Sequence, residues 1–453
     1  MTGVLTVKSG QTTKKIGIVS LGCAKNLVNT EQMMFLLKEA GYEVTGDTDG
    51  ADAIIVNTCG FIDSAKMEAI DTILELDEER RCGKKGKLIV TGCFAERYKE
   101  EILAQLPEVD GVVGVGGFEE IVTAIDSVLK SDEKVAVFGD LNAPISETKR
   151  IITTSRSWAY IKIADGCDNR CAFCIIPKLR GKFRSRPMEK IIGEAKELVN
   201  NGVKELILVA QDSTRYGLDL YGKRCLAQLL TTLSEIEDLK WIRLHYLYPD
   251  DITEELIDVI ADNKKVLKYI DMPIQHVSDN VLQKMNRRGN GKKVRQLLKR
   301  LRERISDVVI RTSVIAGLPG ENDDEFEELY EFLKSEKIER AGVFRYSPEE
   351  GTAAEAMPRP DTELADKRAE ALAQLQSQII DEFNKSRIDS VVTVLIEGAH
   401  DSCFFGRSFA ESPEVDGYIS IFEKDMSIGE FYDILITDVI DGEPVGKPVG
   451  EEA

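Results

Sequence analysis

Three short apolar segments near the start of the chain, each leading into a helical pattern, most constrain how the chain can fold. They read "IGIVSLGC" (16–23), "AIIVNTCG" (53–60) and "KLIVTGC" (87–93). Helical patterns at 29–40 and 63–78 lie between them. Near-continuous apolar strands that alternate with helices are typical of a parallel sheet, with connections of one hand. Residues 14–130 are therefore predicted to form an open parallel α/β domain.

A polar segment, 131–156, leads into a second and longer series of β/α units. Six strands are expected there, at 158–163, 205–210, 241–248, 269–272, 309–316 and 341–346. Six parallel strands are too few for a closed eight-stranded barrel. Residues 153–384, which end in a helical pattern from Thr362 to about Asn384, are therefore predicted to form a partial (β/α)6 barrel.

The C-terminal segment, 387–453, changes character and is strand-like with frequent turn residues. This pattern predicts a small antiparallel β-barrel of about five strands. The segment holds 15 Asp and Glu against 4 Lys and Arg, a net charge of −11 out of −20 for the whole chain. Such an acidic balance disfavours non-specific nucleic-acid binding and favours basic partners.

Length and composition indicate a globular protein of several domains. The chain has 453 residues, of which 43% are hydrophobic and 30% charged. It contains no apolar run of about 18 residues, and its first residues lack an apolar signal region. We therefore expect a cytoplasmic protein without membrane contact, whose nine cysteines serve metal or redox chemistry rather than disulfides.

Cys23, Cys59 and Cys93 each stand at the carboxyl end of a predicted strand. Ligands of open parallel sheets bind at that edge, so we expect the three thiols to share a site. The alternative for any one of them is a buried core thiol. Three thiolates without a matching histidine favour an iron–sulfur cluster or a zinc site that lacks one ligand. Cys82 lies in a polar turn at the other end of its strand and is expected to be uninvolved.

The segment "DGCDNRCAFCIIP", residues 165–177, holds Cys167, Cys171 and Cys174 in a C-x3-C-x2-C arrangement directly after a predicted strand. One loop of this spacing can bind three corners of a cubane cluster and leave its fourth iron without a protein ligand. A zinc site would need a fourth ligand, and neither cysteine nor histidine follows within the loop.

This triplet at the mouth of a partial β/α barrel, with an aromatic residue before the last cysteine, resembles the radical S-adenosylmethionine superfamily. The resemblance implies that S-adenosylmethionine chelates the open iron of a 4Fe–4S cluster. One electron then cleaves its sulfonium and produces a 5′-deoxyadenosyl radical, which abstracts hydrogen from carbon.

The same resemblance suggests further cofactor-binding residues at two strand ends. Gln211 and Asp212 in "LVAQDST" are candidates for binding the cofactor's amino group. Gly317 and Gly320 in "IAGLPGE" would let the backbone approach the adenosine moiety, although the alternative is an ordinary strand-to-helix turn.

A basic segment, "PKLRGKFRSRP" (177–187), follows the triplet. Its charged residues are Lys178, Arg180, Lys182, Arg184 and Arg186. Guanidinium groups suit carboxylates and phosphates, so a role with the cofactor carboxylate or an anionic substrate competes with a solvated charged face. His276 at a strand end either faces the same site or is a satisfied polar residue, and no histidine has the context of a hydrolytic triad.

The whole arrangement looks like the methylthiotransferase family, and all six cysteines match that pattern. Within it "VSLGCAKNLVNTEQM", "VAQDSTRYG", "LHYLYP", "VFRYSPEEGTAA" and "GRSFAESPEVDGYI" are similar to the RimO type. The resemblance implies a radical transferase with two 4Fe–4S clusters, the second one serving the sulfur, and a C-terminal domain of the TRAM kind. The RimO type adds a methylthio group to the β-carbon of an aspartate in ribosomal protein uS12.

Alternatives to this activity remain at this stage. Relatives of the MiaB type modify an adenosine of tRNA, and a more basic tail would be expected of them. A non-catalytic iron–sulfur module is a third hypothesis. The partners expected for the RimO type are uS12, free or in the small subunit, and an electron donor of the flavodoxin or ferredoxin class. The sulfur source and the oligomeric state do not follow from the sequence.

Overall fold

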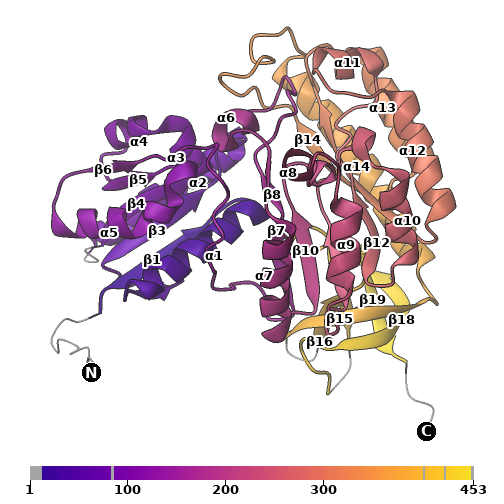
Figure 1. The fold of residues 1–453 in the computed structure, drawn as a ribbon. Helices are drawn as coiled ribbons and strands as arrows, with labels where there is room; N and C mark the ends of the chain where they lie inside the picture. Colours follow the sequence, from indigo (N-terminus) through magenta and orange to yellow (C-terminus); the bar gives the residue numbers. More distant parts are fainter. Residues whose placement is uncertain (1–12, 83–85, 401–402, 423–424, 450–453) are drawn as a thin grey trace. The chain divides into compact units, whose positions relative to one another are not determined.

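The computed structural model describes residues 13–82, 86–400, 403–422 and 425–449 (Figure 1). The first 12 residues, for which the sequence predicts no signal region, lie outside this range. The chain divides into two compact units, Met1–Thr153 with Lys178–Lys182, and Thr154–Pro177 with Phe183–Ala453. We call them unit 1 and unit 2. Among the described residues, no helix is long and apolar enough to cross a membrane.

Unit 1 contains a six-stranded parallel sheet, as predicted, in the order β2-β1-β3-β4-β5-β6. Its strands are β1 (Lys15–Ser20), β2 (Glu43–Thr45), β3 (Ala53–Thr58), β4 (Lys87–Gly92), β5 (Gly111–Val113) and β6 (Val135–Val137). Its helices are α1 (Ala24–Glu39), α2 (Asp63–Arg81), α3 (Cys93–Tyr98), α4 (Glu100–Gln105) and α5 (Ile121–Lys130), with a 3-10 turn at Val115–Glu120. Strands β2, β5 and β6 have three residues each and were not predicted from the sequence.

The central strands of unit 1 are apolar throughout because helices cover both faces of the sheet. Ile54 and Val56 of β3 pack with Ile73 of α2 on one face, while Ile55 packs with Met33 of α1 on the other. Successive side chains of a strand point to opposite faces. The near-continuous apolar pattern is therefore explained by burial on both sides.

Unit 2 is built on a second six-stranded parallel sheet, in the order β14-β13-β12-β11-β10-β7. The strands are β7 (Trp158–Lys162), β10 (Glu205–Val209), β11 (Trp241–Leu244), β12 (Val266–Asp271), β13 (Val309–Ala316) and β14 (Arg340–Arg345). Strands β7 and β14 form its two edges, so the predicted partial barrel is confirmed. Strand β11 ends at Leu244 rather than at Tyr248, because Tyr246 adopts a positive φ of 61°.

Helices connect these strands along one side of the sheet (Figure 1). They are α7 (Met188–Asn200), α8 (Leu218–Tyr221), α9 (Leu226–Ser234), α10 (Glu254–Asp262), α11 (Asp279–Lys284), α12 (Gly291–Arg304) and α13 (Asp323–Glu336). Helix α14 (Thr362–Ser386) follows the last strand, β14, and leads to the C-terminal segment. Two-residue strands β8 (Ala164–Asp165) and β9 (Arg184–Ser185) pair antiparallel, and short helix α6 spans Ile176–Arg180. 3-10 turns lie at Ser213–Arg215 and Pro249–Asp251.

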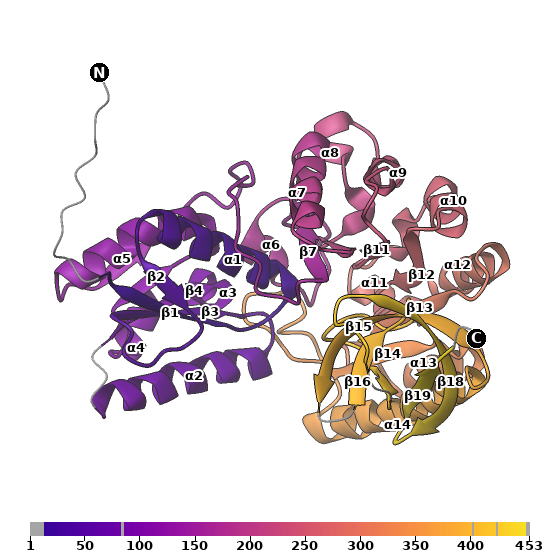
Figure 2. The same cartoon turned by 90° about the horizontal axis from the view of Figure 1, so that it is seen from below.

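The C-terminal segment forms a closed five-stranded barrel in the order β15-β16-β17-β19-β18 (Figure 2). Its strands are β15 (Val391–His400), β16 (Cys403–Arg407), β17 (Ile419–Ile421), β18 (Phe431–Ile440) and β19 (Glu443–Pro448). The predicted strand number is confirmed, but β17 and β19 pair parallel, so the barrel is not purely antiparallel.

The end of β16 and the loop that follows it join the small barrel to the large sheet of unit 2. Arg407 donates to Glu205 of β10 at 2.7 Å, and Arg243 of β11 donates to the other oxygen of Glu205 at 2.7 Å. The hydroxyl of Tyr269 in β12 donates to Asp416 at 2.7 Å. Glu205, Arg243, Tyr269 and Arg407 are buried, and the side chain of Asp416 is only 7% exposed. A buried polar network therefore fixes the small barrel to the large sheet.

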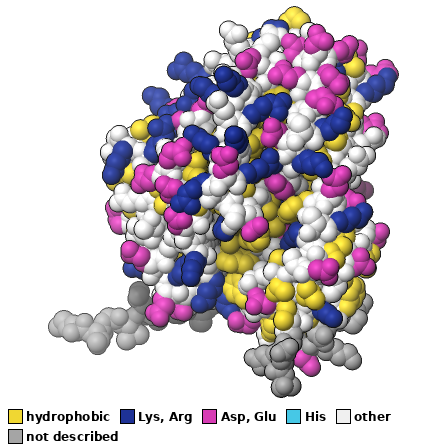
Figure 3. Space-filling view, turned by 90° about the vertical axis from the view of Figure 1, so that its right-hand side faces the viewer, with side chains coloured by type: hydrophobic (Ala, Val, Ile, Leu, Met, Phe, Trp, Pro, Cys, Tyr) yellow, Lys and Arg dark blue, Asp and Glu magenta, His cyan; other side chains and the backbone are white. Residues whose placement is uncertain are grey.

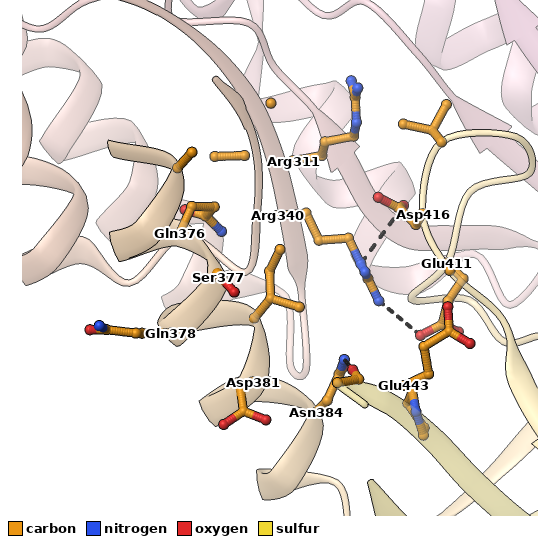
Figure 4. A pocket seen from close by; sticks show the side chains of 18 of the residues that line it. Arg311, Arg340, Gln376, Ser377, Gln378, Asp381, Asn384, Glu411, Asp416 and Glu443 are labelled. Atoms are coloured by element: carbon orange, nitrogen blue, oxygen red, sulfur yellow. Dashed lines mark hydrogen bonds and ion pairs between the residues drawn. The ribbon is translucent and has the colours of Figure 1, made fainter. Parts of the chain in front are cut away.

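A cavity of about 750 Å³ lies where this loop meets β14 and α14 (Figure 4). Arg340, the first residue of β14, crosses it and donates to Glu411 at 2.9 Å. The cavity therefore lies near the amino ends of the parallel strands. Ligand sites of such sheets lie at the carboxyl ends, where the predicted cysteine loop begins.

Candidate functional site

Cys23, Cys59 and Cys93 lie at the carboxyl ends of three strands of unit 1, as the sequence pattern predicts. Cys23 is the N-cap of α1, Cys59 follows β3 directly, and Cys93 begins α3 after β4. Strand β1 has β2 on one side and β3 on the other, so the chain reverses its direction across the sheet at this position. A ligand crevice forms at such a switch point.

Two glycines let the three cysteine loops approach one another closely. A Cβ at Gly22, whose φ is +93°, would lie 2.9 Å from the Cβ of Cys59. A Cβ at Gly60 would lie 2.8 Å from the Cα of Phe94 and 2.9 Å from the carbonyl carbon of Cys93. Side chains at these positions would force the loops apart, so the convergence depends on glycine.

The thiols of unit 1 influence one another electrostatically. Burial raises the pKa of Cys59 to about 12, with further contributions from the charges of Cys93 and Cys23. Burial acts in the same direction at Cys23, but Lys25 and Arg180 outweigh it, and the pKa of Cys23 lies below its ordinary value. Joint ionisation of these thiols therefore calls for additional positive charge among them, which bound iron would supply.

Cys167, Cys171 and Cys174 lie in one loop of unit 2 that follows β8. The N–H of Cys174 donates to the carbonyl of Cys171 at 3.0 Å, which closes a tight turn between them. Ala172 belongs to the same buried apolar cluster as Leu318, so the loop is anchored by packing. A loop of this kind can present three thiols to different corners of one cluster.

Arg287 reaches this loop from the segment after α11. Its Nη1 lies 3.7 Å from the sulfur of Cys171, and its Nη2 donates to the carbonyl of Pro273 at 2.7 Å. The guanidinium also lies 4.8 Å from the ring centre of Tyr248. The sequence offered no signal for Arg287, because it is distant from the cysteine motif along the chain.

Gln211 and Asp212 lie at the carboxyl end of β10, where the sequence predicts cofactor contacts. The Nε2 of Gln211 donates to Asp165 at 3.0 Å, while its buried Oε1 has no hydrogen-bond partner among the described residues. Asp212 accepts hydrogen bonds from Asn169 at 2.8 Å and from Thr214. An orphaned buried acceptor suits a donor from a ligand, so Gln211 fits a cofactor amine better than the satisfied Asp212 does.

Gly317 and Gly320 both have positive φ, of 79° and 91°. A Cβ at Gly317 would lie 2.5 Å from the Cβ of Ala365, which gives this glycine a packing role. Its N–H donates to the carboxylate of Glu321 at 3.0 Å. His276 is fully buried, and its Nδ1 accepts a hydrogen bond from the N–H of Ser278 at 3.0 Å. Its Nε2 lies 3.4 Å from Glu321 but has no hydrogen-bond partner among the described residues, so both alternatives for this histidine stay predictions. The role of the two glycines toward adenosine stays a prediction.

The basic segment 177–187 does not act as one block. Arg180 lies against Cys93 in unit 1, whereas Arg186 in unit 2 donates to Glu194 at 2.7 Å. Lys182 is exposed. Contiguity in the sequence suggested a shared anion site, but the segment's fold gives neighbouring cations different partners.

The chemistry of both thiol sets fits iron–sulfur clusters. Burial raises the pKa of Cys167 to about 11 and also raises that of Cys174, so ionisation of these thiols calls for positive charge, which bound iron would supply. Within the described ranges, no three His, Cys, Asp or Glu side chains are arranged to hold a single ion. A cubane cluster makes a different demand, because each thiolate binds its own iron atom. Cys82 is exposed at the end of α2.

Comparisons with known families cover most of the chain. The Radical SAM superfamily matches residues 161–333, an uncharacterized protein family, UPF0004, matches 15–114, and the TRAM domain matches 388–449. The predicted domain boundaries at 14–130, 153–384 and 387–453 stay predictions.

Solved structures resemble the chain at the level of fold. A radical S-adenosylmethionine methyltransferase, TsrM from Kitasatospora setae, matches with a TM-score of 0.56 at 15% identity. The match covers 76% of this chain and 77% of that one. At this identity the likeness concerns the fold alone.

Curated relatives are similar over nearly the whole length. A protein of Caldanaerobacter subterraneus subsp. tengcongensis is 48% identical over 437 residues, which is 96% of this chain and 100% of the relative. One of Acetivibrio thermocellus is 45% identical over 453 residues, or 97% and 99%. Both are called ribosomal protein uS12 methylthiotransferase RimO. The chain thus belongs to the RimO family of methylthiotransferases within the radical S-adenosylmethionine superfamily.

Proposed function

We propose that the chain is a radical transferase that adds a methylthio group to the β-carbon of an aspartate of ribosomal protein uS12. The observation that carries this proposal is the identity of 45 to 48% to RimO proteins over nearly the full length. Two separate sets of three thiols, each without a fourth protein ligand in its loops, support it. A binding module would not need an open iron at both sites.

The six cysteines would hold two 4Fe–4S clusters, one at Cys23, Cys59 and Cys93, and one at Cys167, Cys171 and Cys174. The second cluster, held by Cys167, Cys171 and Cys174, would supply the electron for cleavage of S-adenosylmethionine and thus for hydrogen abstraction. The chain's own contribution is binding and orientation. Gln211 would accept a hydrogen bond from the cofactor's amino group, and Arg287 would donate one toward the sulfur of Cys171.

The charge of the small barrel supports a basic protein as substrate. Residues 387–453 carry 15 acidic against 4 basic side chains. Figure 3 shows Lys and Arg side chains together with Asp and Glu side chains on one face. We further propose action in the cytoplasm, on free uS12 or on the small subunit, with electrons from a flavodoxin or ferredoxin.

Mass spectrometry of uS12 tests the proposal. Reconstituted protein, S-adenosylmethionine, sulfide and a strong reductant are incubated with uS12 or with small subunits, and the aspartate is expected to gain a methylthio group. A Cys171→Ala variant is the control and should leave uS12 unchanged. Modified tRNA alongside unmodified uS12 would favour the MiaB-type activity. Intact clusters without release of 5′-deoxyadenosine would contradict radical chemistry altogether.

A further inference from the structure

Arg180 contacts the three-cysteine site of unit 1. The segment Lys178–Lys182 belongs to unit 1, although the residues on either side of it belong to unit 2. The Arg180 side chain is only 2% exposed, and its Nη2 lies 3.5 Å from the sulfur of Cys93. In the sequence "CIIPKLR", Arg180 lies only six residues after Cys174. The segment that follows the loop of Cys167, Cys171 and Cys174 therefore provides a residue that contacts Cys93 of the other set.

The orientation of the guanidinium is fixed by two asparagines. Nη1 donates to Oδ1 of Asn29 at 3.3 Å, and Nη2 donates to Oδ1 of Asn26. The amide of Asn26 cannot turn freely, because its Nδ2 donates to the carbonyl of Thr58 at 2.9 Å. Its Oδ1 must therefore face Arg180. Contacts with α1 therefore hold the side chain in one geometry, in which it is directed at Cys93.

Positive charge beside the Cys93 sulfur would act on a cluster bound there. The Nη2 of Arg180 lies 3.5 Å from this sulfur. A cluster bound by three thiolates carries negative charge on its sulfurs. Hydrogen bonds and positive charge beside those sulfurs favour the reduced form and raise the reduction potential.

We propose that Arg180 is a positioning residue for the cluster of Cys23, Cys59 and Cys93, fixing the Cys93 sulfur and raising the reduction potential of that cluster. The inference rests on the proposed function, in which these cysteines hold a 4Fe–4S cluster. Arg180 lies outside the cysteine motifs, on the segment that follows Cys174. In this proposal it sets the reduction potential of the cluster that delivers sulfur.

Potentiometry of the isolated first cluster tests this role. The parent is the full chain with Cys167, Cys171 and Cys174 replaced by alanine, so that only one cluster is reconstituted. Arg180→Gln removes the charge, Arg180→Lys keeps it without the planar fork, and Lys182→Gln removes an exposed charge from the same segment. Midpoint potentials are measured by redox titration followed by electron paramagnetic resonance, together with iron content.

The expected result is a shift to a more negative midpoint potential in Arg180→Gln, a smaller shift in Arg180→Lys, and none in Lys182→Gln. Equal potentials and iron content in all variants would overturn the inference. If Arg180→Gln loses iron while its cluster-free form keeps the parent's melting temperature, the positive charge is needed for cluster binding, which supports the role. If Arg180→Lys has a lower melting temperature but an unchanged midpoint potential, Arg180 has only a structural role, and the inference is wrong. Failure of the parent to bind iron would instead contradict the proposed function.

Discussion

Glu411 joins three parts of unit 2, and replacing it with glutamine should destabilise this unit strongly. One carboxylate oxygen accepts hydrogen bonds from Arg340 of β14 at 2.9 Å and from Arg387 after α14. The other accepts from the N–H and the hydroxyl of Ser408 at 3.0 and 2.6 Å. The side chain is buried, so no water can replace the carboxylate when it is lost.

The size of the effect follows from the pKa of the group. Burial raises the pKa of Glu411, but the charges of Arg387 and Arg340 outweigh burial and bring it from 4.5 to about 2. At about 1.4 kcal/mol per pKa unit, the ionised form contributes about 3 kcal/mol to the free energy of unfolding. Loss of one partner of a buried ion pair typically costs about 3 to 5 kcal/mol, which agrees.

Urea unfolding of the cofactor-free protein, followed by tryptophan fluorescence, measures this loss. The chain has two tryptophans, and Trp158 and Trp241 both lie buried in unit 2. The signal therefore reports the unit in which Glu411 lies. Glu411→Gln should lower the free energy of unfolding by about 3 kcal/mol at pH 7. Glu443→Gln, which neutralises an exposed carboxylate of the same barrel, should change it little.

The pH dependence gives a second check with a definite sign. Because the folded pKa lies below the unfolded one, the contribution of Glu411 is complete above about pH 5 and is lost as the pH falls toward 2. The difference between wild type and Glu411→Gln should shrink to about 1 kcal/mol at pH 3. A difference no larger than that of the control at pH 7, or one independent of pH, would refute this reasoning.

Three further predictions concern the candidate site. Cys59→Ala should halve the bound iron while cleavage of S-adenosylmethionine persists, whereas Cys171→Ala should abolish cleavage. Iron analysis and the release of 5′-deoxyadenosine measure both effects. The reverse pattern would exchange the roles assigned to the two sets of cysteines. Gly92→Ala should lower the thermal stability of unit 1, because Gly92 has a φ of +93° and an added Cβ would clash with the Oδ1 of Asn57. Amide hydrogen exchange of unit 1 measures this effect, and an unchanged exchange pattern would contradict the prediction. Gln211→Leu should raise the KM for S-adenosylmethionine more than it lowers kcat, as initial rates over a concentration series would reveal.

The sequence by itself determined the two parallel sheets, the small barrel, and the positions of six cysteines, three at strand ends and three in one loop. Periodicity reports which face of an element is buried, and this sufficed for β3, whose apolar run meets helices on both sides. The spacing of Cys167, Cys171 and Cys174 constrains a single loop, so local sequence carries its geometry. The short edge strands β2 and β6 could not be predicted, because three residues are too few to show a periodic pattern of apolar side chains.

Only the tertiary structure decided which polar side chains meet. Arg180 lies against Cys93 and Arg287 against Cys171, although long stretches of chain separate each pair. The sequence displays the charge of an arginine but not its partner, because the partner depends on how distant elements pack. A buried charge must nevertheless be paired, so the fold assigns each cation a partner that its neighbours along the chain do not reveal.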